Sequence, residues 1–386
     1  LTEDLIFLMH LSFLTSEYPH PRVNRAAGIG TSIKNLAEGL VGQKVRVSIF
    51  IYGQDEDVVF EENGITFHLI KHIKYKFLGW YLYRKYLAKY INKAIAEDHI
   101  DAIEAADWTG ITAFMKLKAP LVIRLHGTDA YFCNLELRTQ KKKNYWFESK
   151  ALKNADVVIS VSDFTAIKTK EIFGLSRKII TLYNGIDTEK FKPLEIEKKP
   201  NSILYFGTII RKKGVLDLAK AFQLLRKKNP EATITIVGKD NHDIIEQKST
   251  LSLFTECLDN ESRTAVIHLK HMPYEKVVEE IAKAQIIVLP SRAEAFPMSW
   301  LEAMAMEKAM VTSDIGWAKE VMIQNETGLM VDPNDHQGLA DAISEILSDK
   351  EKGIRFGCNA RKRIVENFSI EIIVKDNIEF YTSLLK

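Results

Sequence analysis

Residues 286–306 read IIVLPSRAEAFPMSWLEAMAM and carry the clearest structural signal in the chain. The apolar run Ile286–Leu289 predicts a buried parallel strand, which Pro290 ends. Good helix formers follow from Met298 onward, and Pro297 suits the first turn, where a missing N–H costs nothing. The stretch therefore predicts a strand, a loop and a helix. In an open α/β sheet, ligands bind at such a strand's carboxyl end.

Two glutamates flank this predicted helix start. Glu294 lies in the loop after the strand, and Glu302 lies about a turn into the helix. The free backbone N–H groups near Met298 and Ser299 favour an anion. Carboxylates accept hydrogen bonds from sugar hydroxyls, so the arrangement suits a ligand with both phosphates and hydroxyls. Taken alone, such a glutamate pair is more often two solvated surface acids.

The bulk composition indicates a globular protein of two domains, because 386 residues exceed one ordinary core. A net charge of +2 gives no argument for nucleic acid. The three cysteines show no ligand spacing, which favours a reduced compartment and neither a disulfide frame nor a zinc site. No apolar stretch is long enough to span a bilayer. Residues 1–8 do not read as a signal peptide, and they are either an extension before the first strand or not native to the protein.

The N-terminal half opens with a β-α-β pattern. A strand is expected at His10–Thr15 and a helix at about Thr31–Leu40, with Gly28 and Gly30 at the helix start, where backbone can approach a phosphate. Ile33 stands where a dinucleotide fingerprint needs its third glycine, so the pattern argues against a nucleotide-dependent oxidoreductase.

Residues 71–95 interleave basic and aromatic side chains without an acid. One interpretation is a surface helix with an aromatic core stripe and a basic outer face. The other is a platform for an acceptor or a membrane surface, since Lys and Arg attract anionic lipid. The sequence leaves both open.

Further motifs fall at expected strand ends. Asp55 and Asp57 lie in an acidic run that reads as a solvated loop rather than a metal site. His126 follows an apolar strand and precedes Gly127, which places it at the ligand edge, although a lone histidine there is more often structural. Asp129 is expected to cap the next helix.

Capping residues are also expected farther along the chain, at Asp163 and Thr165. In the second half, a strand ends at Gly207 and a helix is expected from about Val215. Arg211 and Lys213 belong to a basic cluster between them. Such clusters are usually solvated, but this one shares a sheet edge with Glu294, where a departing diphosphate would need positive charge.

Several motifs occur in a characteristic order: AGIGT at 27–31, RLHGTD at 124–129, YNGID at 183–187, Lys213 before Gly214, and EAFP from Glu294 with Glu302 eight positions later. Together they resemble the retaining, nucleotide-sugar-dependent glycosyltransferases of family four, which have the GT-B fold. Two positions depart from the family pattern. Ala27 replaces a glycine, and Thr208 replaces an arginine, so Arg211 is expected to supply that phosphate contact.

The resemblance implies an α/β protein with two Rossmann-like domains facing across a cleft that closes on the ligands. Residues 1–190 would form the acceptor-side domain, and residues 200–369 would form the nucleotide-sugar-binding domain. A last helix within 370–386 would cross back onto the first domain.

The resemblance also implies roles for individual residues. His126, Glu294 and Lys213 would be catalytic. His126 would position the sugar, Glu294 would steady positive charge at the anomeric carbon, and Lys213 would stabilise the diphosphate. No metal site and no cofactor besides the UDP- or GDP-linked sugar are expected. The donor-binding residues would be Gly28, Gly30, Arg211, Met272, Phe296, Pro297, Met298, Ser299 and Glu302, with His271 and Met272 lining the base pocket.

The expected function is transfer of a hexose-type sugar to a glycan, lipid-linked or protein-linked acceptor. The expected location is the cytoplasm, with peripheral contact at the inner membrane face through residues 71–95 as an option. A nucleotide-sugar epimerase of similar fold and a non-catalytic nucleotide-sugar-binding scaffold stay open as alternatives. A glycosidase that uses the two glutamates is discounted, because its phosphate-type loops would be idle.

Overall fold

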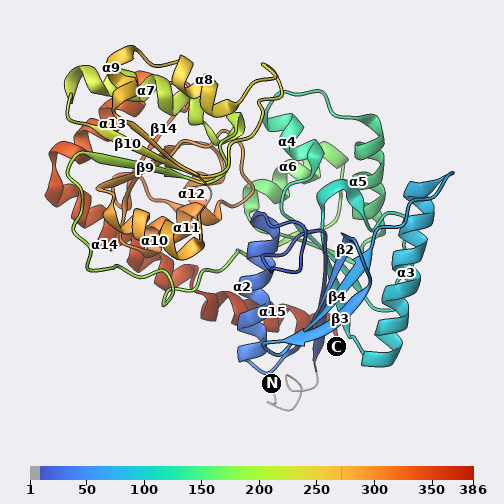
Figure 1. Ribbon diagram of the computed structural model, residues 1–386. Helices are drawn as coiled ribbons and strands as arrows, with labels where there is room; N and C mark the ends of the chain where they lie inside the picture. The colour runs from blue at the N-terminus through green and yellow to red at the C-terminus, as the bar shows by residue number, and fades with distance from the viewer. Residues whose placement is uncertain (1–8, 271) are drawn as a thin grey trace. The chain divides into compact units, whose positions relative to one another are not determined.

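The computed structural model describes residues 9–270 and 272–386, which fall into two compact units (Figure 1). Unit 1 comprises the described residues up to Gly185 together with Ser369–Lys386. Unit 2 comprises Ile186–Phe368. The predicted extension at residues 1–8 and the predicted base-pocket residue His271 lie outside the described part of the chain.

Unit 1 contains an eight-stranded sheet of order β3-β4-β2-β1-β5-β6-β7-β8. Neighbouring strands are parallel except for the antiparallel pair β3 and β4. The predicted first strand is confirmed at both ends. The strands are β1 (His10–Thr15), β2 (Arg46–Gln54), β3 (Val58–Glu62), β4 (Ile65–Lys71), β5 (Ala102–Ala106), β6 (Leu121–Leu125), β7 (Val157–Ser160) and β8 (Ile180–Thr181).

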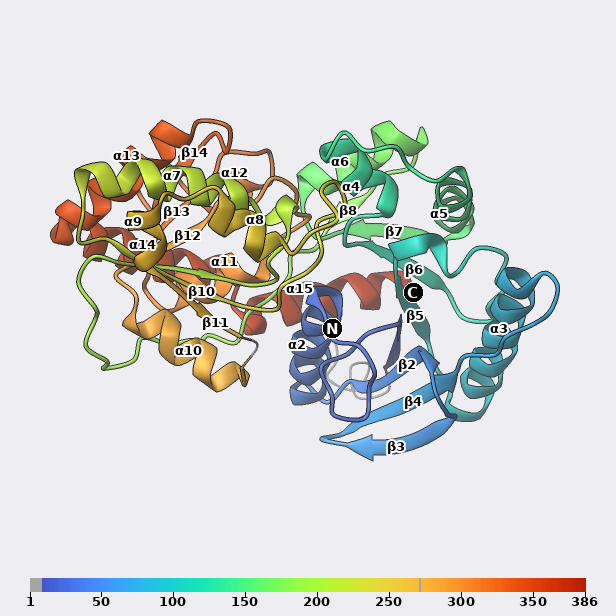
Figure 2. The ribbon, with the colours of Figure 1, turned by 45° about the horizontal axis from the view of Figure 1, so that its top comes forward.

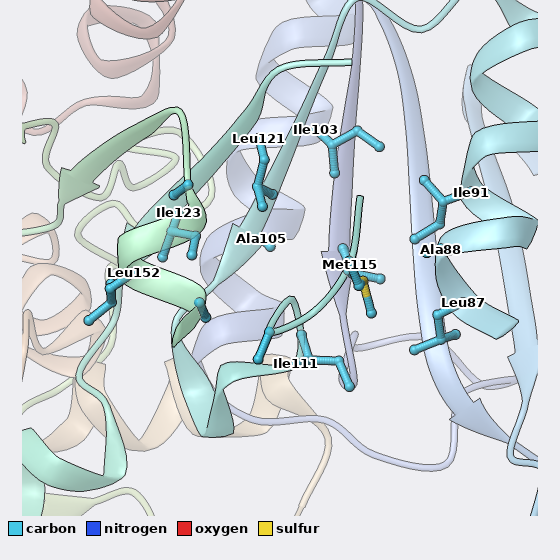
Figure 3. Packing of buried hydrophobic residues seen from close by; sticks show 14 of the residues in the cluster. Leu87, Ala88, Ile91, Ile103, Ala105, Ile111, Met115, Leu121, Ile123 and Leu152 are labelled. Carbon is cyan, nitrogen blue, oxygen red and sulfur yellow. The ribbon is translucent and has the colours of Figure 1, made fainter. Parts of the chain in front are cut away.

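Helices cover both faces of this sheet, and alternate strand residues therefore enter two separate cores. On one face, α2 and α15 pack side by side against residues such as Phe13 and Ile49 (Figure 2). On the other face, Leu87, Ala88 and Ile91 of α3 point toward the sheet (Figure 3). The helices are α2 (Gly28–Gly42), α3 (Gly79–Asp98), η1 (Trp108–Gly110), α4 (Asp129–Leu135), α5 (Lys142–Asn154), α6 (Asp163–Phe173) and α15 (Ile370–Leu384).

Unit 2 contains a six-stranded, wholly parallel sheet of order β11-β10-β9-β12-β13-β14. The strands are β9 (Ser202–Phe206), β10 (Thr233–Val237), β11 (Val266–Leu269), β12 (Ile286–Leu289), β13 (Ala309–Ser313) and β14 (Leu329–Val331). The helices are η2 (Arg211–Lys213), α7 (Val215–Lys228), α8 (Thr250–Glu256), α9 (Asn260–Thr264), α10 (Tyr274–Lys283), α11 (Met298–Ala305), α12 (Ala318–Val321), α13 (His336–Ser348) and α14 (Lys350–Asn367). The strand and helix predicted within residues 286–306 are both confirmed.

Three local predictions need correction. The helix expected across 71–95 begins only at Gly79, since residues 72–75 form a loop after β4 and Leu78 has a left-handed backbone. The cap of α4 is Thr128 rather than Asp129, because the Thr128 side chain accepts from the Tyr131 N–H.

The cap of α6 is Ser162 rather than Asp163 or Thr165, because its side chain accepts from the Thr165 N–H. In both helices the cap lies just before the first helical residue, where a short polar side chain reaches an unpaired N–H.

Each sheet has a point where the strand order reverses direction, and parallel α/β sheets bind ligands at such points. In unit 1 it lies between β1 and β5, and in unit 2 between β9 and β12. None of the helices in the described residues is long and apolar enough to cross a membrane.

Candidate functional site

In unit 2, the loops that follow β9 and β12 are joined at the reversal point of the sheet. The backbone N–H groups of Arg292 and Ala293 donate to the Lys212 carbonyl at 2.8 and 3.3 Å. Gly214 has a left-handed backbone with φ +70°, and a Cβ there would lie 1.8 Å from the Pro290 carbonyl oxygen. Only glycine therefore lets the start of α7 approach the loop after β12 so closely.

This junction brings Lys213 and Glu294 together. The Lys213 Nζ donates to Glu294 Oε1, although the two residues are 81 positions apart in sequence. Glu294 is 8% exposed, so its carboxylate is largely removed from water and needs this counter-charge. The ion pair places one cation and one carboxylate at the carboxyl edge of the sheet.

Glu302 supplies a second buried carboxylate, on α11. Burial raises its pKa from the ordinary 4.5 to about 7, while a hydrogen bond from Tyr274 and the charges of Lys190 and Lys213 lower it in part. Lys213 thus interacts with both glutamates. At neutral pH a group with this pKa is close to half ionised.

The start of α11 offers backbone donors beside these charges. The helix begins at Met298 after Pro297, and both Met298 and Ser299 are half-buried. Among the described residues, the backbone N–H groups of Met298 and Ser299 take no hydrogen-bond partner. Phe296 is buried, and its ring packs 5.6 Å from that of Phe368. Unpaired N–H groups at a helix start attract an anion.

Arg211 and Met272, two further predicted donor-binding residues, lie in η2 and in the loop before α10. The guanidinium of Arg211 donates to both carboxylate oxygens of Asp243, at 2.7 and 3.0 Å, and these bonds are the main reason that the pKa of Asp243 lies below its ordinary value. This pairing occupies one face of Arg211, so its phosphate contact stays a prediction. Met272 is half-buried in the loop between β11 and α10.

The predicted glycine loop belongs to unit 1, where α2 begins at Gly28. The Gly30 N–H donates to Glu17 Oε1 at 3.1 Å, and a Cβ on Gly30 would lie 2.8 Å from the Glu17 carbonyl oxygen. The protein's own carboxylate therefore meets the start of this helix. A Cβ on Gly28 would meet nothing within 4 Å, so packing within the chain does not require glycine there.

His126 also belongs to unit 1, directly after β6. Its backbone N–H donates to Asp107 Oδ1 at 3.0 Å, and the Gly127 N–H donates to Oδ2 at 3.1 Å. Burial and the nearby Arg124 lower the pKa of His126 to about 3, so its ring is neutral at physiological pH. A neutral imidazole can donate one hydrogen bond and accept another.

The sequence interpretation missed three residues that shape these sites: Asp107, Asp243 and Tyr274. Asp107 comes directly after β5, and an acid at the end of an apolar strand could have been recognised from the sequence as a candidate site residue. Asp243 lies in the loop between β10 and α8, and Tyr274 is the first residue of α10, and neither stands in a recognisable pattern. None of the described residues form a cluster of three or more His, Cys, Asp or Glu side chains that could hold a metal ion.

Two family models match the chain. The model described as Glycosyltransferase Family 4 matches residues 26–190, and the one described as Glycosyl transferases group 1 matches residues 186–363. An uncharacterized glycosyltransferase of Methanocaldococcus jannaschii is 25% identical, over 97% of this chain and 98% of the relative. A glycogen synthase of Mycobacterium tuberculosis is 27% identical, over 73% of this chain and 68% of the relative.

Solved structures are similar over almost the full chain. Sucrose-phosphate synthase from Thermosynechococcus elongatus has a TM-score of 0.79 at 20% identity, covering 97% of this chain and 99% of that one. HepE of Anabaena, solved in complex with UDP and glucose, has a TM-score of 0.75 at 19% identity, covering 97% and 100%. At these identities the likeness shows a shared fold.

Proposed function

Since the chain belongs to glycosyltransferase family four, the glycosyl transferases group 1, we propose that it moves a hexose from UDP or GDP to an acceptor hydroxyl with retained anomeric configuration. It has the GT-B fold, and as a member of this family it takes its sugar from a nucleotide-sugar donor. The observation that carries the proposal is the position of Lys213 between two buried carboxylates at the sheet's reversal point.

The donor is proposed to bind unit 2 along this edge. Glu302 accepts hydrogen bonds from the ribose hydroxyls, and the N–H groups of Met298 and Ser299 contact the diphosphate. Lys213 lies where it can shift from Glu294 toward a phosphate oxygen. Glu294 then accepts from sugar hydroxyls. Phe296, Pro297 and Met272 line the donor, and His126 positions the sugar as a neutral hydrogen-bonding group.

The reaction exchanges one bond at the anomeric carbon for another. The acceptor oxygen forms the new bond on the face that the diphosphate leaves, and the bond between that carbon and the diphosphate oxygen breaks with its electron pair. The acceptor proton passes to the departing phosphate. Lys213 and the N–H groups stabilise the negative charge that develops there, and Glu294 stabilises the positive charge at carbon. We propose that these groups serve in place of a metal ion.

The names of similar proteins guide the choice of substrates. HepE was solved with UDP and glucose, which makes UDP-glucose the first donor to try. One relative, from Corynebacterium urealyticum, is named for D-inositol 3-phosphate, and a capsular polysaccharide glycosyltransferase of Staphylococcus aureus is also similar. The acceptor classes to test are therefore glycans and phosphorylated polyols, beside lipid-linked and protein-linked acceptors.

Calorimetric titration with UDP, GDP, ADP and NAD, without added metal, tests the donor assignment. Selective binding of UDP or GDP, lost in Lys213→Met, is the expected result. Binding of NAD alone, or of no nucleotide, would reject the donor site. A nucleotide-sugar epimerase would convert the donor sugar without any acceptor. The anomeric proton coupling of the transferred sugar in NMR would report whether configuration is retained.

A further inference from the structure

Unit 1 contains a cavity of about 820 Å³ at the reversal point of its own sheet. Its walls come from residues after β1, β4 and β5, from the end of β2, and from the start of α3. The volume lies in the range of pockets that hold small ligands. None of the donor-binding residues assigned above line it, so a ligand bound here would be distinct from the donor.

The walls combine aromatic rings with positive charge. The cations Arg25, Lys74 and Arg84 and the rings of Tyr75, Trp80 and Tyr83 all line the cavity. Among the described residues, no aspartate or glutamate lines it. Arginine and lysine recognise phosphate and carboxylate groups, and aromatic faces stack on sugar rings or on apolar chains.

Arg84 is the most informative of these side chains, because it is 93% buried yet has no carboxylate partner among the described residues. Its Nη1 donates to the Trp80 carbonyl at 2.8 Å, and its Nη2 donates to the Gly110 carbonyl at 3.2 Å. Its Nε is buried and takes no partner among the described residues. The guanidinium stacks 4.1 Å from the centre of the Phe147 ring.

A buried charge without a counter-charge is costly, and proteins keep one where a ligand or partner supplies the opposite charge. Burial raises the pKa of Tyr52, which lines the same pocket, above its ordinary value, so this phenol supplies no negative charge. Burial also lowers the pKa of Arg84 to about 10, which leaves it charged at neutral pH. The pocket therefore presents an uncompensated positive charge to whatever fills it.

We propose that this cavity holds the acceptor and that the acceptor carries a phosphate group, bound by Arg84 and Lys74, beside a ring or chain that packs on Trp80 and Tyr75. The identification of the ligand as the acceptor rests on the proposed function, whereas the anion site follows from unit 1 alone. The phosphate belongs either to a soluble sugar phosphate or to a lipid headgroup. The lipid headgroup is included because the apolar side chains of Phe77 and Leu78, which lie beside the lining residues in sequence, are 82% and 62% exposed and could contact a membrane surface.

The experiment uses the full chain and two sets of probes. D-glucose 6-phosphate is titrated against D-glucose as the uncharged control. Vesicles of phosphatidylglycerol and phosphatidylcholine are sedimented with the protein, against vesicles of phosphatidylcholine alone. The variants are Arg84→Met and Lys74→Glu, with Lys89→Glu as the matched control, because Lys89 is an exposed lysine of α3 that does not line the cavity.

The expected result is that one anionic probe binds at least tenfold more tightly than its uncharged control. That preference should fall at least tenfold in Lys74→Glu and in Arg84→Met, and should persist in Lys89→Glu. Preference for the sugar phosphate assigns a soluble acceptor, and preference for the anionic vesicles alone assigns a lipid. If neither probe is preferred, or if Lys74→Glu and Lys89→Glu behave alike, the proposal is wrong.

Two controls keep the outcomes apart. If circular dichroism shows that Arg84→Met is unfolded, Lys74→Glu decides, since Lys74 is exposed and its replacement leaves the core intact. UDP is titrated into every variant. If the wild-type chain does not bind UDP, the proposed donor site is wrong, but the anion site in unit 1 is not affected by that result. Unchanged UDP binding with no anion preference would reject only the inference made here.

Discussion

Asp107 holds the backbone of His126 in place, since its carboxylate accepts the N–H of His126 at 3.0 Å and that of Gly127 at 3.1 Å. Asp107 is 1% exposed, and burial raises its pKa to about 8. The loop that carries His126 therefore depends on an acid from the neighbouring strand end. The effect of Asp107 on the stability of this loop can therefore be tested separately from the predicted role of His126 in positioning the sugar.

Replacing Asp107 by alanine should lower the free energy of unfolding by about 2–4 kcal/mol, because two buried N–H groups lose their acceptor. Urea denaturation measures the change. Asp107→Asn keeps one acceptor oxygen and should lose less. A change below about 0.5 kcal/mol in the alanine variant would show that water replaces the carboxylate.

Donor affinity should rise with pH through the titration of Glu302. Its pKa of about 7 in the empty site means that the carboxylate is protonated below that pH, and a ligand whose hydroxyls donate to it prefers the ionised form. The dissociation constant for UDP should therefore fall between about pH 6 and 8. In Glu302→Gln, the pH dependence of the dissociation constant that comes from Glu302 should disappear. Only the dependence that comes from the titration of UDP itself should remain. Equal pH profiles in both proteins would contradict the assignment.

Lys213→Met should reduce turnover of the sugar donor by about two orders of magnitude or more, because the charge that stabilises the leaving diphosphate is lost. Glu294→Gln should have a comparable effect through the developing positive charge at carbon. Lys220→Met, at an exposed position of α7, is the matched control and should retain wild-type turnover. Initial rates of UDP release measure all three.

Gly214→Ala should weaken UDP binding by tenfold or more, because the new Cβ would collide with the Pro290 carbonyl and push the two loops of unit 2 apart. Its left-handed backbone adds about 1 kcal/mol of strain for any other residue. Gly42→Ala is the control, since a Cβ there meets nothing within 4 Å. Calorimetry that gives equal affinities for both variants would refute the role of this close approach.

Glu104→Ala should destabilise unit 1 by about 3–5 kcal/mol, because it leaves a buried arginine without its counter-charge. Arg124 binds both Glu104 oxygens, at 2.8 and 2.9 Å, and Tyr381 of α15 donates to the same carboxylate. The exposed pair of Lys93 and Glu97 supplies the control, because Glu97→Ala should change stability by no more than about 0.5 kcal/mol. Urea denaturation of both variants provides the comparison.

Local patterns in the chain predicted the elements around the donor site well. The strand Ile286–Leu289 and the helix from Met298 were both placed correctly, because an apolar run, a proline and a series of helix formers act over a few residues. The start of α3 was misplaced, since a basic and aromatic composition does not distinguish a loop from a helix. The caps were misplaced by one residue or more, because several short polar side chains compete at a helix start.

The sequence by itself determined the two α/β halves, the order of the motifs and the candidate residues Lys213, Glu294, Glu302 and His126. Only the tertiary structure decided which side chains meet. Lys213 reaches Glu294 because β9 and β12 are neighbours in the sheet, and Arg211 is held by Asp243 from another loop. That Arg84 is buried without a carboxylate partner in the described part of the chain could likewise not be predicted from the sequence. The physical reason is that propensities act between near neighbours in the chain, whereas ion pairing and burial depend on strand order and packing across the whole unit.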